Sequence, residues 1–286
     1  MFKKILAIFL VITGLYIVIS SLPILNWIGL GNGALEAAVS ERTDEISINT
    51  SSVHTIIIPD KRSDVKAEYD GKGKVEVDQK GDKIVVTAKG PRFGFFSFKQ
   101  RGDLKLYIPE DYDQDMNIKV GSGSLEFAGD SAKDPYQLNN LSLNVGSGRM
   151  EVQNIKANHV EHDISSGFMK VNSLSAKSGS FEVSSGSLHA EDYTGAFEAE
   201  VSSGELNLEV KKLTGPAEIE VSSGKADLNL PDDADFTLNS KVSSGSVNND
   251  FQLTDKSSGK NRLSGTHGSG THKINLDVSS GNIYLH

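Results

Sequence analysis

The sequence predicts an all-β protein: a β-solenoid, right-handed and of the parallel β-helix type, with repeats of roughly 20 residues. A Ser-Gly pair recurs along the chain, apolar residues alternate on both sides of it, and helix is expected only near the N-terminus. The glycines of these pairs are Gly123, Gly148, Gly167, Gly186, Gly204, Gly224, Gly245 and Gly281. Their spacings are 25, 19, 19, 18, 20, 21 and 36 residues. A near-constant period is typical of a solenoid, in which each repeat stacks on the preceding one.

Before the repeats, residues 1–30 predict a membrane anchor. Residues 5–30 carry no charge and are long enough to cross a bilayer as one helix. Lys3 and Lys4 precede this stretch, which favours a cytoplasmic N-terminus and an extracytoplasmic solenoid. A cleaved signal peptide is the alternative, but its apolar core would be shorter and a small-residue cleavage site would follow. We therefore expect a single-pass protein of the cell membrane, with secretion as the alternative.

Residues 31–44 are expected to form a polar linker, and residues 45–110 an irregular β region that caps the solenoid. Inside the cap lies a loop rich in phenylalanine and basic residues, which we interpret as an apolar plug for the open end of the stack. The alternative is a docking loop for the membrane or a partner. The loop residues are Arg92, Phe93, Phe95, Phe96, Phe98, Lys99 and Arg101.

Residues 111–286 contain the regular repeats, with a Ser/Gly-rich insert at 257–272 that we expect to be flexible. Counted from each glycine, positions −5, −3, +2 and +4 are mostly apolar and are predicted to face inward. The change of phase across the Ser-Gly pair requires a bend, and we expect glycine there for its backbone freedom. The serine before each glycine is interpreted as a hydroxyl ladder, with a ligand-binding surface as the alternative.

Acidic residues gather at positions −4 and −6, which should face solvent. Such a row is either a solvated face that opposes sheet aggregation or a surface that binds cations or basic ligands. Its members are Glu161, Asp163, Glu182, Glu198, Glu200, Glu218 and Glu220.

The sequence excludes several kinds of chemistry. It contains no cysteine and has a net charge of −9, which argues against thiol chemistry and nucleic-acid binding. His162 lies in an inward column and is expected to be a core residue rather than a metal ligand. His267 and His272 lie in the insert, where we expect only adventitious metal binding. No catalytic, cofactor-binding or metal-binding residue is predicted, although rows of glutamate meet the spacing that glycoside hydrolysis requires.

The strand KLYIPEDY and the repeated Val-(Gly/Ser)-Ser-Gly-x-apolar-x-apolar units resemble the bacterial adhesin-like β-solenoid family. With the N-terminal anchor, the chain is similar to membrane-anchored proteins of envelope-stress operons in Gram-positive bacteria. The resemblance covers about residues 45–286 and implies an envelope role without catalytic residues. We expect a non-enzymatic interaction module that binds wall polymer or an envelope protein. A polysaccharide-acting β-helix enzyme and a structural spacer are the alternatives.

Overall fold

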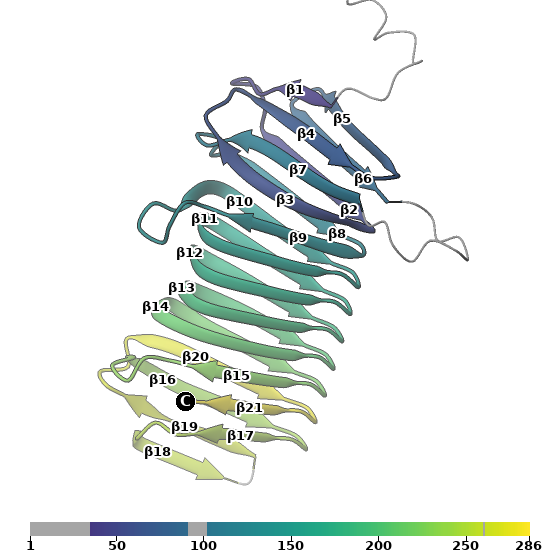
Figure 1. The fold of residues 1–286 in the computed structure, drawn as a ribbon. Helices are drawn as coiled ribbons and strands as arrows, with labels where there is room; N and C mark the ends of the chain where they lie inside the picture. The colour runs from purple at the N-terminus through teal and green to yellow at the C-terminus, as the bar shows by residue number, and fades with distance from the viewer. Residues whose placement is uncertain (1–34, 91–101, 260) are drawn as a thin grey trace, which may run out of the picture.

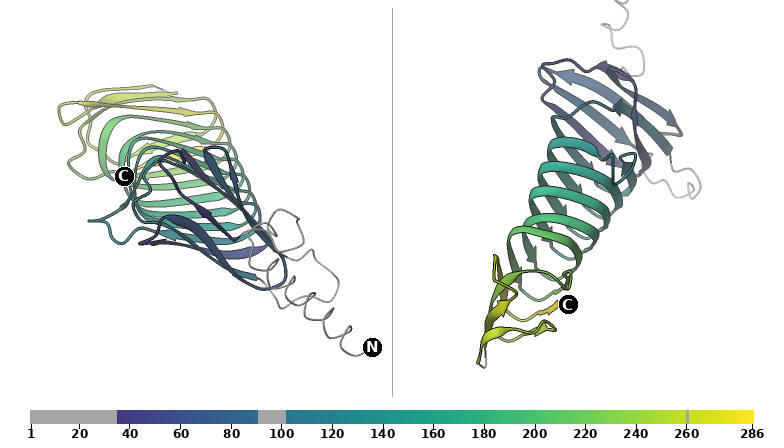
Figure 2. Two further views of the ribbon diagram at one scale, coloured as in Figure 1. Left: turned by 90° about the horizontal axis from the view of Figure 1, so that it is seen from above. Right: turned by 90° about the vertical axis from the view of Figure 1, so that its left-hand side faces the viewer.

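The structure is a computed structural model that describes residues 35–90, 102–259 and 261–286. These residues form an elongated all-β rod (Figures 1 and 2). Within these ranges there is no helix of the length and apolarity needed to cross a bilayer. The predicted anchor at 5–30 and the loop from Arg92 to Arg101 lie outside the described residues.

The body of the rod consists of coils, each with one strand before the Ser-Gly corner and one after it. Parallel ladders join each coil to the next. Most partners are offset by 18 to 20 residues, such as Val145 with Ile164 and Val201 with Val221, whereas Val120 and Val145 of the first coil are offset by 25. The strands of this part are β8 (Asp115–Val120), β9 (Gly123–Ala128), β10 (Tyr136–Val145), β11 (Arg149–Ile164), β12 (Phe168–Val183), β13 (Ser187–Val201) and β14 (Glu205–Val221). The predicted repeat length and parallel stacking are therefore confirmed.

Strands β11, β12 and β13 each cover two sides of the rod because they bend at one residue in the left-handed region. These residues are Asn154, Ser173 and Asp192, with φ of 58°, 54° and 57°. Asn and Asp tolerate this region better than most side chains do. The corner and this bend divide each coil into a pre-corner strand and a post-corner strand. Stacking then gives the rod a pre-corner face and a post-corner face.

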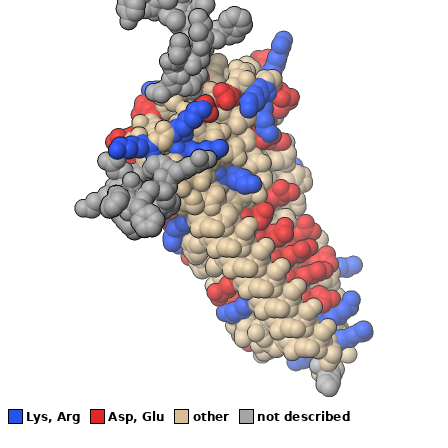
Figure 3. Space-filling view, turned by 90° about the vertical axis from the view of Figure 1, so that its right-hand side faces the viewer, with Lys and Arg blue, Asp and Glu red and all other residues tan. Residues whose placement is uncertain are grey.

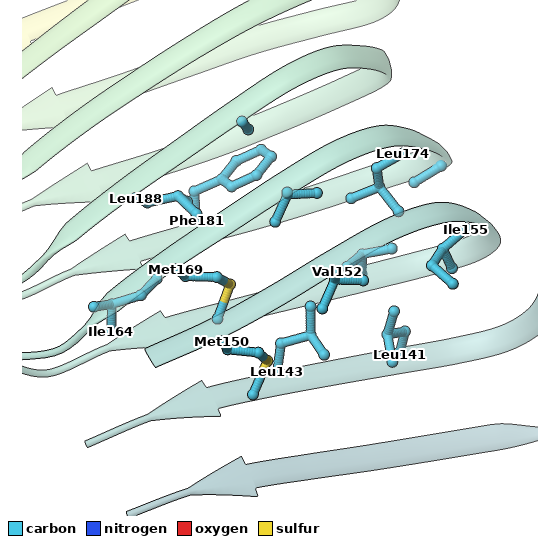
Figure 4. Close-up of a cluster of buried hydrophobic side chains, with 14 of the residues drawn as sticks. Leu141, Leu143, Met150, Val152, Ile155, Ile164, Met169, Leu174, Phe181 and Leu188 are labelled. Atoms are coloured by element: carbon cyan, nitrogen blue, oxygen red, sulfur yellow. The ribbon is translucent and has the colours of Figure 1, made fainter. Parts of the chain in front are cut away.

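The predicted inward positions are buried between the two faces. Leu143, Val145, Met150 and Val152 are each at most 2% exposed. Residues of later coils continue these stacks, as Met169 and Leu188 do after Met150 (Figure 4). Each coil thus extends one continuous apolar core, which a single coil could not form.

At the corners, main-chain groups rather than serine hydroxyls connect the coils. The amide of Ser185 donates to the carbonyl of Ser165 at 2.8 Å, and that of Ser223 donates to Ser202 at 2.7 Å. Among the described corners, hydroxyl-to-hydroxyl bonds join only Ser51 and Ser52 to Ser122. The expected hydroxyl ladder is therefore replaced by an amide ladder along most of the rod, because adjacent corners align their backbone groups in register.

Glycine is required at the corner for a reason other than the one predicted. Only Gly123 among the corner glycines has a positive φ, at 95°. At Gly224, an added Cβ would lie 2.7 Å from Cγ1 of Val201 and would overlap the carbonyl oxygen of Gly204. The preceding coil therefore occupies the space that any side chain would need.

The N-terminal end combines a cap with an inserted strand pair. The strands here are β1 (Glu36–Ala38), β2 (Glu45–Ser51), β3 (Val53–Asp60), β4 (Asp64–Asp70), β5 (Lys74–Lys80), β6 (Lys83–Lys89) and β7 (Gly102–Pro109). Antiparallel pairing joins β5 to β6 and β4 to β7. Strand β2, however, lies between β6 and β8, and β3 lies between β7 and β9.

The C-terminal end repeats this arrangement. Its strands are β15 (Lys225–Asn229), β16 (Phe236–Val242), β17 (Ser246–Asn249), β18 (Thr254–Gly259), β19 (Arg262–His267), β20 (His272–Val278) and β21 (Asn282–Leu285). Strand β20 lies between β14 and β16, and β21 lies between β15 and β17. The expectation that each repeat stacks on the preceding one is therefore wrong here, because the last repeat is inserted one position earlier.

The Ser/Gly-rich insert is ordered rather than flexible in its main part. Strands β18 and β19 form an antiparallel hairpin, and β19 pairs with β16. His267 packs against Phe236 and Phe251, with ring centroids 5.5 and 4.9 Å apart. The hairpin and these rings cover the C-terminal end of the core.

His162 is a core residue, as predicted. It is 1% exposed, and its ring stacks on Phe181 at 4.5 Å. Nδ1 lies 3.0 Å from the carbonyl oxygen of Ser180, whereas Nε2 has no hydrogen-bond partner. Burial lowers the pKa of His162 to about 4, so the imidazole is neutral at physiological pH.

We predict that Gly224→Ala destabilises the rod by roughly 2 kcal/mol, because the added methyl group overlaps the preceding coil. Gly259→Ala is the control, since no atom lies within 4 Å of its added Cβ. Chemical denaturation of both variants measures the difference. Equal stability of the two variants would contradict the close approach of the corners.

We also predict a specific acid sensitivity. The unfolded chain binds a proton at His162 below about pH 6.5, whereas the folded chain does so only below about pH 4. Stability is therefore lost as pH falls through this window, by about 3 kcal/mol at pH 4. His162→Leu should remove this part of the pH dependence, as measured by denaturant unfolding at pH 4 and pH 8. Parallel pH profiles for variant and parent would contradict the burial of a neutral imidazole.

Candidate functional site

The acidic residues predicted at positions −4 and −6 all lie exposed on the pre-corner face. Parallel register places them in two columns that run along the rod. In the first column, Asp163 is beside Glu182, Glu182 beside Glu200, and Glu200 beside Glu220. The second column contains Glu161, Ser180, Glu198 and Glu218 in the same order. Neighbouring members are separated by about 4.8 Å, the distance between strands.

The inserted strand β20 adds one more carboxylate to the first column. Asp277 lies beside Glu220, so the first column contains five successive carboxylates. We call these two columns, with Asp277, the acidic stripe. Acidic side chains gather along the rod in this region (Figure 3). Asp277 also occupies position −4 before Gly281, but only the order of stacking shows that it follows Glu220 directly.

The two faces of the rod differ in whether their carboxylates form ion pairs. Among the described residues, no ion pair includes a carboxylate of the acidic stripe. On the post-corner face, Arg149 pairs with Glu151 at 2.8 Å, and Lys225 pairs with Asp227 at 3.2 Å. The post-corner carboxylates are thus largely neutralised within the protein, whereas those of the stripe form no ion pair, even at Asp277, which lies beside Lys241 of β16.

A shallow hollow of about 450 Å³ lies along the second column of the stripe. Glu161, Glu198 and Glu218 line it, together with His159 and Gly179. Here the parallel ladder is interrupted between Ser175 and Ser178, and the coil is shortened to 18 residues. The hollow therefore lies where the ladder between neighbouring coils is irregular.

The hollow offers hydrogen-bond acceptors and negative charge, without an arrangement that identifies a catalytic pair. Nδ1 of His159 is 2.6 Å from Oγ of Ser178, and no carboxylate is hydrogen-bonded to this ring. Within the described ranges, no three His, Asp or Glu side chains are placed to hold a metal ion. The geometry supports recognition of a cationic group more directly than bond cleavage.

Three solved structures resemble this chain at low sequence identity. A candidate adhesin from Bacteroides fragilis is 14% identical, with 88% of this chain and 95% of that chain covered and a TM-score of 0.47. A candidate lipid-binding protein from Parabacteroides distasonis is 16% identical, with 88% and 95% covered and a TM-score of 0.44. A candidate cell adhesion protein from Clostridium sporogenes is 15% identical, with 87% and 96% covered and a TM-score of 0.28.

A comparison with curated proteins gives no match. The family comparison is decisive, because one model covers the whole solenoid and most of the chain. It begins at Thr43, just before β2, and extends through the inserted pair β20–β21. Residues 43–286 match the Toastrack DUF4097 model, and the chain therefore belongs to the Toastrack DUF4097 family.

Proposed function

We propose that this chain is a non-enzymatic envelope protein whose acidic stripe binds a cationic partner. Residues 5–30 would anchor it in the cell membrane with the N-terminus inside, so that the rod lies outside the cytoplasm. In this position the rod would present the stripe to wall polymer or to an envelope protein, and it would serve the envelope-stress response that the sequence resemblance suggests.

The observation that carries this proposal is the lack of internal neutralisation along the acidic stripe. Like charges directly opposite each other on neighbouring strands destabilise a sheet. The post-corner face offsets part of this cost with ion pairs between strands, such as Lys225 with Glu205, whereas no ion pair includes a carboxylate of the stripe. A local arrangement that costs stability without compensation inside the protein is typical of a functional surface.

The partner should be extended and should carry several positive groups. The stripe follows the long axis of the rod over five strands from β11 to β20. Exposed charges act strongly on a ligand when several lie within one Debye length, and the attraction weakens as salt increases. Amino groups on a wall polymer or a basic segment of an envelope protein meet this requirement.

We predict that full-length protein in uncharged nanodiscs binds poly-L-lysine, with an affinity that falls as salt increases. Neutralising Glu182, Glu200, Glu220 and Asp277 as their amides should weaken binding by tenfold or more at low salt. The control neutralises Glu126, Glu151, Glu205 and Asp227 in the same way, since these residues lie on the post-corner strands β9, β11, β14 and β15. Isothermal titration calorimetry measures both variants.

Equal weakening by the two sets would show that net charge alone governs binding, and it would contradict a site on the stripe. Binding as strong in the stripe variant as in the parent would also contradict a site on the stripe. It would favour the alternative that the rod is a structural spacer. Hydrolysis of wall glycan by the full-length chain, abolished by Glu200→Gln or Glu220→Gln, would overturn the non-enzymatic assignment.

A further inference from the structure

Both ends of the rod depend on an inserted strand pair. At the N-terminal end, β2 forms parallel ladders with β6 on one side and β8 on the other. Backbone bonds continue beyond the strand, since the amide of Asp44 donates to Asp82 and that of Asp115 donates to Asp44. Ile46 and Ile48 of β2 are completely buried. This pair therefore joins the cap to the body through hydrogen bonds on both edges and through the core.

The pair β20–β21 has the same role at the C-terminal end. Leu276 lies between Ile219 and Ser240, and Ile283 lies between Ala226 and Val247. Across the described strands, no ladder connects β14 directly to β16 or β15 directly to β17. The coil formed by β16 and β17, which we call the final coil, and the hairpin β18–β19 are therefore attached to the body through β20–β21.

A polar latch holds the connection that leads into this pair. Residues 268–271 join β19 to β20, and Gly268 and Gly270 have φ of 65° and 75°. The Asp235 carboxylate accepts hydrogen bonds from the amide of Thr271 at 3.1 Å and from its hydroxyl at 2.8 Å. It also accepts from Oγ of Ser269 and the amide of Gly270 at 2.5 Å. These bonds hold the pKa of Asp235 well below its usual value.

We propose that β20–β21 is a lock that controls the unfolding of the rod, and that Asp235 is its latch. Withdrawal of this pair separates the final coil from the body and exposes two edges on each face. The inner coils have equivalent neighbours on both sides and begin to open only after an end coil has left. At the C-terminal end, the lock thus replaces coil-by-coil unravelling with one slow opening step.

The test uses disulfides in a chain that has no cysteine of its own. Glu220→Cys/Asp277→Cys pins the lock to the body, because these residues are register partners in β14 and β20. The control Glu182→Cys/Glu200→Cys joins register partners of the same column inside the body. Each oxidised protein is compared with its reduced form by unfolding kinetics in denaturant. Loop closure itself acts on the unfolded chain, so the unfolding rate reports the opening step.

We expect oxidation to slow unfolding by tenfold or more for the lock pair and by less than about twofold for the control pair. Equal slowing, or slowing only by the control pair, would overturn the proposal. So would failure of the lock pair to oxidise under conditions in which the control pair does.

The latch is tested separately with Asp235→Ala. We expect this variant to unfold several-fold faster and to speed hydrogen exchange in β20 and β21, because the connection loses its carboxylate partner. Asp233→Ala is the control, as this exposed residue lies with Asp235 in the segment between β15 and β16. In the oxidised lock variant, Asp235→Ala should no longer accelerate unfolding. Acceleration that persists there, or that Asp233→Ala matches, would contradict the latch.

Discussion

At every Ser-Gly corner of the rod, the backbone of one coil lies against that of its neighbour with no room for a side chain between them. The amide of Ser203 donates to the carbonyl of Ser184, and the following Gly204 lies against Gly186 of the coil before it. This close approach sets the spacing of the coils and aligns the strands on both faces in register. The inward columns of apolar residues follow from the same register, and so do the outward columns of charge.

The register explains why the acidic stripe can exist at all. A fixed strand spacing places Asp163, Glu182, Glu200 and Glu220 side by side with no freedom to separate their backbones. The post-corner face has the same geometry but combines opposite charges, as in Lys225 and Glu205 on neighbouring strands. The difference between the faces therefore lies in the side chains, and it directs our functional proposal to the pre-corner face. Membership of the Toastrack family describes the scaffold that holds this stripe.

Much of the fold could be predicted from local alternation, because period-two patterning determines which residues face inward. The sequence also contains an indication of the bends, because Asn154, Ser173 and Asp192 each follow a corner glycine by six residues. The steric need for glycine depends on a neighbouring coil and cannot be read from one repeat. The order of stacking could not be read from one repeat either, because it depends on which coils pair in space, although the polar inward residues Ser240 and Asn249 set the Gly245 repeat apart. The position of Asp277 next to Glu220 was missed for this reason.

The arrangement of the coils at the C-terminal end depends on the insertion of β20–β21 between two repeats that precede it in the sequence. Two double-cysteine variants that both contain Lys241→Cys test this order of strands. Lys241→Cys/Asp277→Cys places the two thiols on adjacent strands, whereas Glu220→Cys/Lys241→Cys separates them by the intervening β20. We expect mild oxidation to close an intramolecular disulfide in the first variant and not in the second. A disulfide between positions 220 and 241, with none between 241 and 277, would show sequential stacking and would contradict the insertion of β20.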